Sequence, residues 1–142
     1  MLKIGMIGAG IIANHHENYI SDLEDSKITA VCDIRREAAE EMAERHEAEV
    51  FTDYQKLLAT DVDIVYICTP PHLHKEMAVA AADADKHIFL EKPMALTYED
   101  GVKIKEAVDE AGVKCQGGDG VGFRAVGEKA RSILKEGSLG SL

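Results

Sequence analysis

The sequence predicts an α/β protein in which helices cover both faces of a parallel sheet, and two observations carry this prediction. Short runs that are apolar throughout alternate with amphipathic stretches of helix length across the 142 residues. Runs without alternating polar residues are typical of strands that are covered on both faces. Strands that alternate with helices along the chain favour a parallel sheet joined by right-handed helical crossovers.

Five strands and six helices are predicted from these runs. The strands are the apolar runs at residues 3–7, 28–32, 64–68, 87–90 and 113–116. The helices are the amphipathic stretches at residues 11–23, 35–46, 54–59, 73–82, 98–111 and 126–135. Capping signals support two of the helices, because Asp53 precedes the third, and Thr97 with Asp100 three residues later begins the fifth.

Composition excludes several classes of protein. Hydrophobic residues make up 46% of the chain and charged residues 30%, which is the balance of a folded globular domain. No apolar run reaches the roughly 18 residues that cross a bilayer, so we expect no membrane partner. The formal net charge of −10 argues against nucleic-acid binding, which depends on lysine and arginine neutralising phosphates.

The cysteines indicate a reducing compartment. Cys32, Cys68 and Cys115 are an odd number, lack the spacing of a metal site, and lie in or beside predicted strands. We therefore expect buried free thiols, no metal and a cytoplasmic location.

A glycine-rich loop joins the first predicted strand to the first helix. GAGIIA at residues 8–13 fits the pattern G-x-G-x-x-G/A. In this place Gly8 permits the tight turn, Gly10 lets a pyrophosphate approach the backbone, and Ala13 allows close packing of helix on strand. The free N–H groups at the start of the helix then bind the anion. A simple glycine turn is the alternative interpretation.

Asp33 extends this interpretation to a nicotinamide dinucleotide. It ends the second predicted strand, 23 residues after Gly10. In dinucleotide-binding folds, an acidic residue about 20 residues after the glycine loop hydrogen-bonds the adenosine ribose. A carboxylate there repels a 2′-phosphate and so favours NAD over NADP. Arg35 and Arg36 argue the other way, because a guanidinium near the ribose accommodates that phosphate, and they can equally be solvated residues of a first helical turn.

Two further predicted strands end in residues that can bind a ligand or take part in catalysis. Ligands of open parallel sheets bind at the carboxyl ends of the strands. Thr69, Pro70 and His74 follow the strand at residues 64–68, and Glu91 with Lys92 follows the strand at residues 87–90. A lysine beside a carboxylate at such an end is a candidate acid–base group. Alternatively, His74 is a capping or surface residue, and Glu91 and Lys92 form a surface ion pair. The sequence leaves open whether the peptide bond before Pro93 is cis.

Taken in order, the motifs GAGIIA, CD, CTPPHLH and HIFLEKP resemble those of the Gfo/Idh/MocA oxidoreductases, which include glucose–fructose oxidoreductase and inositol dehydrogenase. The resemblance runs over nearly the whole chain, residues 2–142. It implies a Rossmann domain that binds NAD or NADP. It also implies that Gly8, Gly10, Ile11 and Ile12 bind the pyrophosphate and Asp33 the ribose. From its place beside Asp33, we expect Arg35 to be a further cofactor contact.

The same resemblance assigns the other end of the cofactor. It implies that Thr69, Pro70 and His74 line the nicotinamide end and that Glu91 lies nearby. Lys92 matches the family lysine that contacts the reacting oxygen of the substrate and assists proton movement. We therefore expect Lys92 to be the catalytic residue and a further cofactor contact.

The sequence also departs from the family pattern. We expect residues 1–120 to form the nucleotide-binding domain and residues 121–142 to form a glycine-rich loop and helix leading to the family's C-terminal α+β domain, which is absent here. Gly120 and Gly122 stand where the family usually has an asparagine and an Arg-Phe pair, with only Phe123 retained. Asp85 replaces a common glycine, which is a mild change because aspartate tolerates a left-handed helix end.

The sequence therefore predicts the nucleotide-binding domain of an NAD(P)-dependent dehydrogenase that acts on a sugar, polyol or related hydroxyl compound. The alternative is a stand-alone NAD(H)-binding regulatory or sensor module without turnover. We expect this chain alone to be inactive, since a small-molecule substrate needs a second domain. The sheet end left open favours weak self-association as a homo-oligomer.

Overall fold

The computed structural model describes residues 1–118 and 125–137. Its centre is a six-stranded sheet, parallel throughout, with the order β3-β2-β1-β4-β5-β6. The strands are β1 (Leu2–Ile7), β2 (Ser26–Cys32), β3 (Glu49–Phe51), β4 (Ile64–Ile67), β5 (His87–Leu90) and β6 (Cys115–Gly117). This is the strand order of the dinucleotide-binding Rossmann fold, so the predicted fold class is confirmed.

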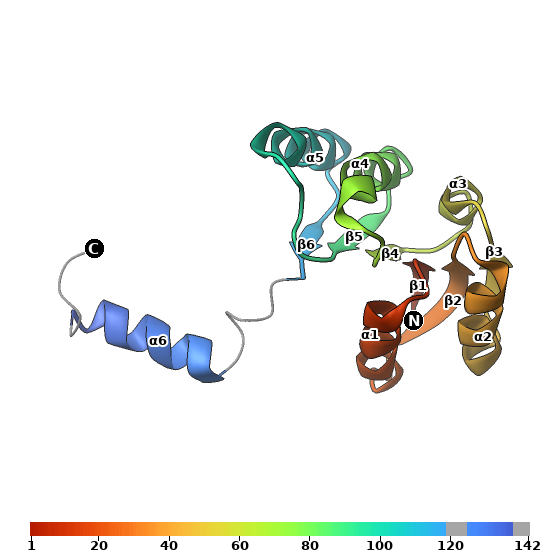
Figure 1. Ribbon diagram of the computed structural model, residues 1–142, viewed down its shortest axis with the longest axis horizontal. Coiled ribbons are helices and arrows are strands. Elements are labelled where there is room, and N and C mark those ends of the chain that lie inside the picture. The colour runs from red at the N-terminus through yellow and green to blue at the C-terminus, as the bar shows by residue number, and fades with distance from the viewer. Residues whose placement is uncertain (119–124, 138–142) are drawn as a thin grey trace.

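Helices cover both faces of the sheet (Figure 1). Helices α1 (Ile11–Ser21) and α2 (Arg36–His46) pack on one face. Helices α3 (Tyr54–Leu58), α4 (His74–Asp83) and α5 (Tyr98–Ala111) pack on the other, and a 3₁₀ turn at Pro71–Leu73 precedes α4. The last helix, α6 (Ala125–Lys135), follows residues 119–124 in the chain.

Side chains of successive strand residues enter two separate cores. Val65 and Ile67 of β4 are completely buried under α3, α4 and α5, whereas Tyr66 between them packs on the α1–α2 side. Because both faces are covered, both sets of positions are apolar. This is the physical reason that the strands read as continuous apolar runs in the sequence.

The boundaries of the predicted strands and helices agree with the structure to within two residues, and one strand was not predicted. Strand β3, a three-residue edge strand that pairs with β2, is the element that was not predicted. The last strand begins at Cys115 rather than at residue 113. The predicted caps are confirmed, because Asp53 accepts a hydrogen bond from the Gln55 N–H and Thr97 from the Asp100 N–H. Asp85 adopts the left-handed conformation, with φ of 57°.

The three cysteines are free thiols. Cys32 and Cys68 are buried as expected, and burial raises their pKa to about 11 and about 12 respectively. Cys115 is only half-buried, which corrects the expectation for that residue. Within residues 1–118 and 125–137, no helix has the length and apolar character needed to cross a membrane.

Candidate nucleotide-binding site

The loop after β1 has a shape that requires glycine at its first position. Gly8 adopts φ of +94°, which L side chains rarely adopt. A Cβ atom there would lie 2.9 Å from the carbonyl oxygen of Cys68. Gly8 therefore lets the loop lie directly against the end of β4, its neighbour in the sheet.

Gly10 leaves open space at the start of α1. A Cβ atom at this position would meet nothing within 4 Å, so neither packing nor backbone strain requires glycine here. The first helical hydrogen bond runs from the Asn14 N–H to the Gly10 carbonyl, 3.1 Å, so the N–H groups of Ile11, Ile12 and Ala13 precede it. Ala13 is completely buried against the sheet. The loop thus presents unpaired helix N–H groups to an uncrowded space, which fits a bound pyrophosphate.

Asp33 at the end of β2 joins two loops. One carboxylate oxygen accepts a hydrogen bond from the Ala9 N–H at 2.8 Å, and the other from the Arg35 N–H at 2.9 Å. A carboxylate has about four lone-pair sites, so each oxygen keeps acceptor capacity for a ribose hydroxyl. The side chain is 11% exposed, which places it at the edge of the cavity rather than in the core.

The two arginines after Asp33 differ in their surroundings. Arg35 lines the cavity, and its Nε lies 3.6 Å from the Asp33 carboxylate. Arg36 pairs instead with Glu40 one helical turn on, at 2.8 Å. Arg35 is therefore the arginine placed to meet a group on the ribose.

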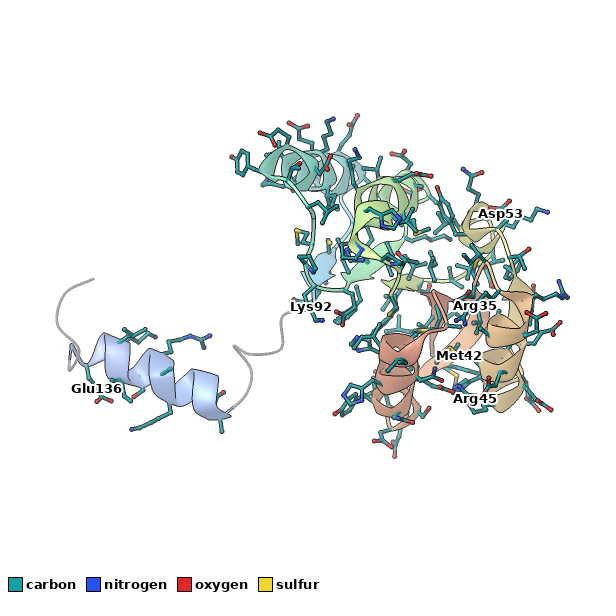
Figure 2. All side chains as sticks on the ribbon, viewed as in Figure 1. Arg35, Met42, Arg45, Asp53, Lys92 and Glu136 are labelled. Atoms are coloured by element: carbon teal, nitrogen blue, oxygen red, sulfur yellow. The ribbon has the colours of Figure 1, made fainter. Side chains whose placement is uncertain are left out.

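A cavity of about 440 Å³ opens at the carboxyl ends of the strands. This volume lies within the roughly 300–1,000 Å³ of small-molecule sites. The cavity spans the point where the strand order reverses, between β1 and β4. Its lining comes from the loops after four strands and the start of α4: Ile7, Gly8, Gly10, Cys32, Asp33, Ile34, Arg35, Thr52, Asp53, Tyr54, Cys68, Thr69, Pro70, Leu73 and Met77. Figure 2 shows Arg35 and Asp53 on the β2–β3 side, with Lys92 set apart on the β5–β6 side.

Of the three residues expected at the nicotinamide end, Thr69 and Pro70 line the cavity and His74 does not. The His74 side chain is completely buried. Its Nδ1 lies 2.9 Å from the carbonyl oxygen of Pro93 and its Nε2 lies 2.8 Å from that of Thr69. Both ring nitrogens thus face backbone rather than open space.

Glu91 is buried at the end of β5 and is already paired. It is 5% exposed, and its Oε1 lies 2.7 Å from Nε2 of His16 on α1. Its Oε2 accepts a hydrogen bond from the Lys92 N–H at 2.8 Å. The sequence analysis missed His16. A signal was present, because His16 lies three residues after Ala13, and that spacing puts both on the sheet-facing side of a helix.

Lys92 is exposed at the start of the loop after β5, and the peptide bond to Pro93 is cis. Among residues 1–118 and 125–137, no group of three or more histidine, cysteine, aspartate or glutamate side chains is arranged to bind a metal. Gly120, Gly122 and Phe123, where the sequence departs from the family pattern, lie outside the described residues, as do residues 138–142.

Known proteins resemble this chain in sequence and in fold. A family model described as "Oxidoreductase family, NAD-binding Rossmann fold" matches residues 2–118. The chain is 34% identical to 2,7-anhydro-N-acetylneuraminate hydratase of Escherichia coli, over 100% of the chain and 38% of that protein. It is 30% identical to myo-inositol 2-dehydrogenase of Thermotoga maritima, over 98% of the chain and 42% of that protein.

A solved structure resembles this chain in fold as well as in sequence. The WlbA dehydrogenase from Chromobacterium violaceum, in complex with NADH and UDP-GlcNAcA, superposes with a TM-score of 0.91 at 30% identity. The match covers 96% of this chain and 40% of the dehydrogenase. The chain therefore spans about two-fifths of the length of the relatives it matches. The family match, the strand order and the glycine loop agree, and the chain belongs to the Gfo/Idh/MocA oxidoreductase family, as its NAD-binding Rossmann domain.

Proposed function

We propose that this chain is the cofactor-binding part of an NAD-dependent oxidoreductase that acts on a sugar, polyol or related hydroxyl compound. The observation that carries the proposal is the cavity at the carboxyl ends of β1, β2 and β4, with Asp33 on one side and the Lys92 loop beyond the other. The substrate class is supported by the relatives, which include an inositol dehydrogenase and a dehydrogenase solved with a nucleotide sugar.

The cofactor extends from β2 to β5 in this proposal. Residues 8–12 hold the pyrophosphate, because the open space at Gly10 and the N–H groups of Ile11 and Ile12 lie together. Asp33 accepts from the ribose hydroxyls. Thr69 and Pro70 form the wall that leads towards the nicotinamide, since they line the cavity on the β4 side.

NAD is the preferred cofactor in this proposal, and NADP the weaker one. The Asp33 carboxylate sits on the cavity edge, where a 2′-phosphate would bring negative charge against it. Arg35 offers a counter-charge, but its side chain is 67% exposed and its attraction is weakened by solvent.

Lys92 is the catalytic residue of the proposal. When bound, the nicotinamide exchanges a hydride with a carbon of the substrate. The ε-amino group of Lys92 would contact the oxygen on that carbon, accepting the hydroxyl proton when the substrate is oxidised and donating a proton to that oxygen when it is reduced. Glu91 precedes Lys92 in the chain, and its buried carboxylate contacts His16 and the Lys92 N–H.

The rest of the catalytic machinery belongs to the part of the relatives that this chain does not span. We place the boundary of the nucleotide-binding domain at residue 120, before helix α6 (Ala125–Lys135). Substrate contacts beyond Lys92 would come from that further part.

Isothermal titration calorimetry with NAD, NADH, NADP and NADPH tests the proposal on this chain. We expect heats of binding with NAD and NADH and weaker binding of the phosphorylated pair. Gly10→Val puts a branched side chain into the space reserved for the pyrophosphate and should lose most of the affinity. Gly101→Ala, on α5, is the matched control and should bind as the wild type does. Equal affinity of wild type and Gly10→Val would contradict the proposed site.

A further inference from the structure

We infer that His16 and His74 are positioning residues that fix the backbone on either side of Lys92 from opposite faces of the sheet. The inference rests on the proposed function, in which Lys92 contacts the reacting oxygen. His16 belongs to α1 and His74 to α4, and these helices cover different faces. The two side chains reach the loop after β5 by separate routes.

The first route runs through Glu91. Nε2 of His16 lies 2.7 Å from one oxygen of this carboxylate, and the other oxygen accepts the Lys92 N–H at 2.8 Å. The Glu91 side chain is only 7% exposed, so water does not replace these partners. A buried carboxylate without a partner is costly, which means that His16 holds Glu91 where it can receive the Lys92 N–H.

Aromatic neighbours fix the direction of the His16 ring. The ring meets Phe89 edge to face with centroids 4.9 Å apart, and Tyr66 lies 5.8 Å away. Tyr66 and Phe89 are themselves stacked at 4.6 Å on adjacent strands β4 and β5. Phe89 and Glu91 lie two residues apart and therefore on the same face of the sheet, towards α1.

The second route runs through His74 to the residue after Lys92. Nδ1 of His74 lies 2.9 Å from the Pro93 carbonyl oxygen, while Nε2 lies 2.8 Å from that of Thr69. Both partners are acceptors, so the ring donates; a neutral imidazole donates from one nitrogen, a doubly protonated ring from both. The histidine joins the β5 loop to the β4 loop that lines the cavity.

These contacts fix the backbone from which the Lys92 side chain extends. The Lys92 side chain is exposed, so its reach towards the nicotinamide end depends on its backbone. Gly118 lies close to the same carboxylate, because a Cβ atom there would lie 3.2 Å from Glu91 Oε1. Releasing either histidine should loosen the loop without disturbing the phosphate-binding loop after β1.

Amide hydrogen exchange of the ¹⁵N-labelled chain tests the His16 route. In His16→Ala the Lys92 amide should exchange at least about tenfold faster, the expected effect of losing one hydrogen bond to a charged group. His16→Gln keeps a donor at similar reach and should restore most of the protection. His15→Ala is the matched control, because His15 is the exposed neighbour on α1 and contacts Tyr19 instead. Unchanged exchange of the Lys92 amide in a folded His16→Ala would overturn the inference.

Long-range ¹H–¹⁵N spectra of the imidazole rings test the His74 route without removing a core side chain. We expect at least one His74 ring N–H to be protected from exchange with water. Ring protons that exchange at the rate of the exposed His15 would overturn this route.

Addition of NADH separates this inference from the proposed function. In wild type we expect shifts at the amides of residues 8–13 and at Lys92. In His16→Ala the shifts at residues 8–13 should remain and the Lys92 shift should shrink. If the wild type does not bind NADH, the proposed function fails while the exchange test of the apo chain still decides the positioning. If NADH binds and the Lys92 amide responds equally in both proteins, the positioning role alone is wrong.

Discussion

The Asp33 carboxylate has a double role at the scale of single residues. It ties the loop after β1 to the start of α2 through the Ala9 and Arg35 N–H groups. The same oxygens lie on the cavity edge, where the ribose is proposed to bind. The residue proposed to select the cofactor is thus held in place without it, which lowers the entropic cost of ordering that side chain on binding.

Asp33→Ser should reduce the preference for NAD over NADP. Loss of hydrogen bonds to a charged acceptor costs about 1.5–3 kcal/mol each, or roughly tenfold or more in affinity for NAD. NADP affinity should fall less, because the repulsion of its 2′-phosphate is removed and Arg35 remains nearby. Calorimetry with both nucleotides measures the change.

Arg36→Ala is the control for this prediction, since Arg36 is paired with Glu40 and should not affect either affinity. Tighter binding of NADP than of NAD by the wild type would show that Arg35 outweighs Asp33.

The surroundings of the Glu17 carboxylate indicate how the free energy of unfolding depends on pH. It is 5% exposed on α1, and its carboxylate accepts hydrogen bonds from Arg45 at 2.6 and 2.7 Å and lies 2.6 Å from His46 Nε2. The Arg45 hydrogen bonds, with a smaller contribution from His46, hold the pKa of Glu17 below its ordinary value of 4.5 against the opposing effect of burial. A lowered pKa means that this stabilisation is complete above the unfolded pKa and is lost as the pH falls through the folded pKa.

Glu17→Gln should therefore lower the free energy of unfolding at pH 7 by about 1–3 kcal/mol, because Arg45 and His46 lose their charged acceptor. Below the folded pKa the variant and the wild type should converge, since the wild-type carboxyl is then neutral. Urea unfolding over a series of pH values falling from 7 measures both effects. Glu44→Gln on the exposed face of α2 is the control. A constant difference between the variant and the wild type at all pH values would contradict this account.

Single residues also show how far the sequence could predict the site. The positions of Gly8, Gly10 and Asp33 follow from local spacing around one strand and one helix, and the structure places them together. His16 and Glu91 are 75 residues apart in the chain, so their contact depends on how α1 packs against β5. His74 was expected to face the ligand, but it is oriented by two backbone carbonyls that no local pattern reveals.

At the scale of elements, the predictable features are those with a strong local cause. The bounds of α5 were predicted without error, because a Thr97 cap begins the helix and Gly112 in the left-handed conformation ends it. Strand β3 was missed because it has three residues, begins with exposed Glu49 and lies at the edge of the sheet. Its pairing with β2 stabilises it, and its sequence alone does not.

Helix α5 also contains a site where stability can be increased. Gly101 lies inside the helix, where glycine costs about 0.5–1 kcal/mol relative to alanine. A Cβ atom there would lie 3.9 Å from the Cβ of Ala95, an ordinary contact. Gly101→Ala should therefore raise the free energy of unfolding by about 0.5–1 kcal/mol, measurable in urea.

The same substitution at Gly8 provides the contrast. Gly8→Ala should destabilise the chain, because its Cβ would lie 2.9 Å from the Cys68 carbonyl oxygen at a φ of +94°. Destabilisation by Gly101→Ala, or a neutral effect of Gly8→Ala, would show that local space does not decide these positions.

At the scale of the whole molecule, the two ends of the proposed cofactor site differ. The adenosine side has a cavity with walls from the loops after β1, β2, β3 and β4. The Lys92 side has an exposed lysine, and none of the described residues of the β5 loop lines that cavity. The adenosine side of the proposed site thus has a formed cavity, while on the side of the proposed reaction the Lys92 side chain is exposed to solvent.

This asymmetry predicts that the purified 142-residue chain binds NAD but gives negligible dehydrogenase turnover. Hydride transfer needs the substrate held against the nicotinamide, and a closed site excludes water and fixes that geometry. Lys92 is exposed, and the adjacent Glu91 carboxylate is already engaged by His16 and by the Lys92 N–H. In the relatives, roughly three-fifths of the chain lies beyond the matched region.

The assay incubates the chain with NAD and a panel of polyols, inositols and sugars and follows the absorbance of NADH. We expect rates below roughly 1 s⁻¹, the low end of ordinary enzymes. Lys92→Ala and Lys56→Ala form a matched pair, because Lys56 is an equally exposed lysine on α3, away from the β5 loop. A contaminating dehydrogenase would leave the same rate in both variants. Turnover above that limit, abolished by Lys92→Ala and kept by Lys56→Ala, would contradict the prediction and show that the loop after β5 orients a substrate without a second domain.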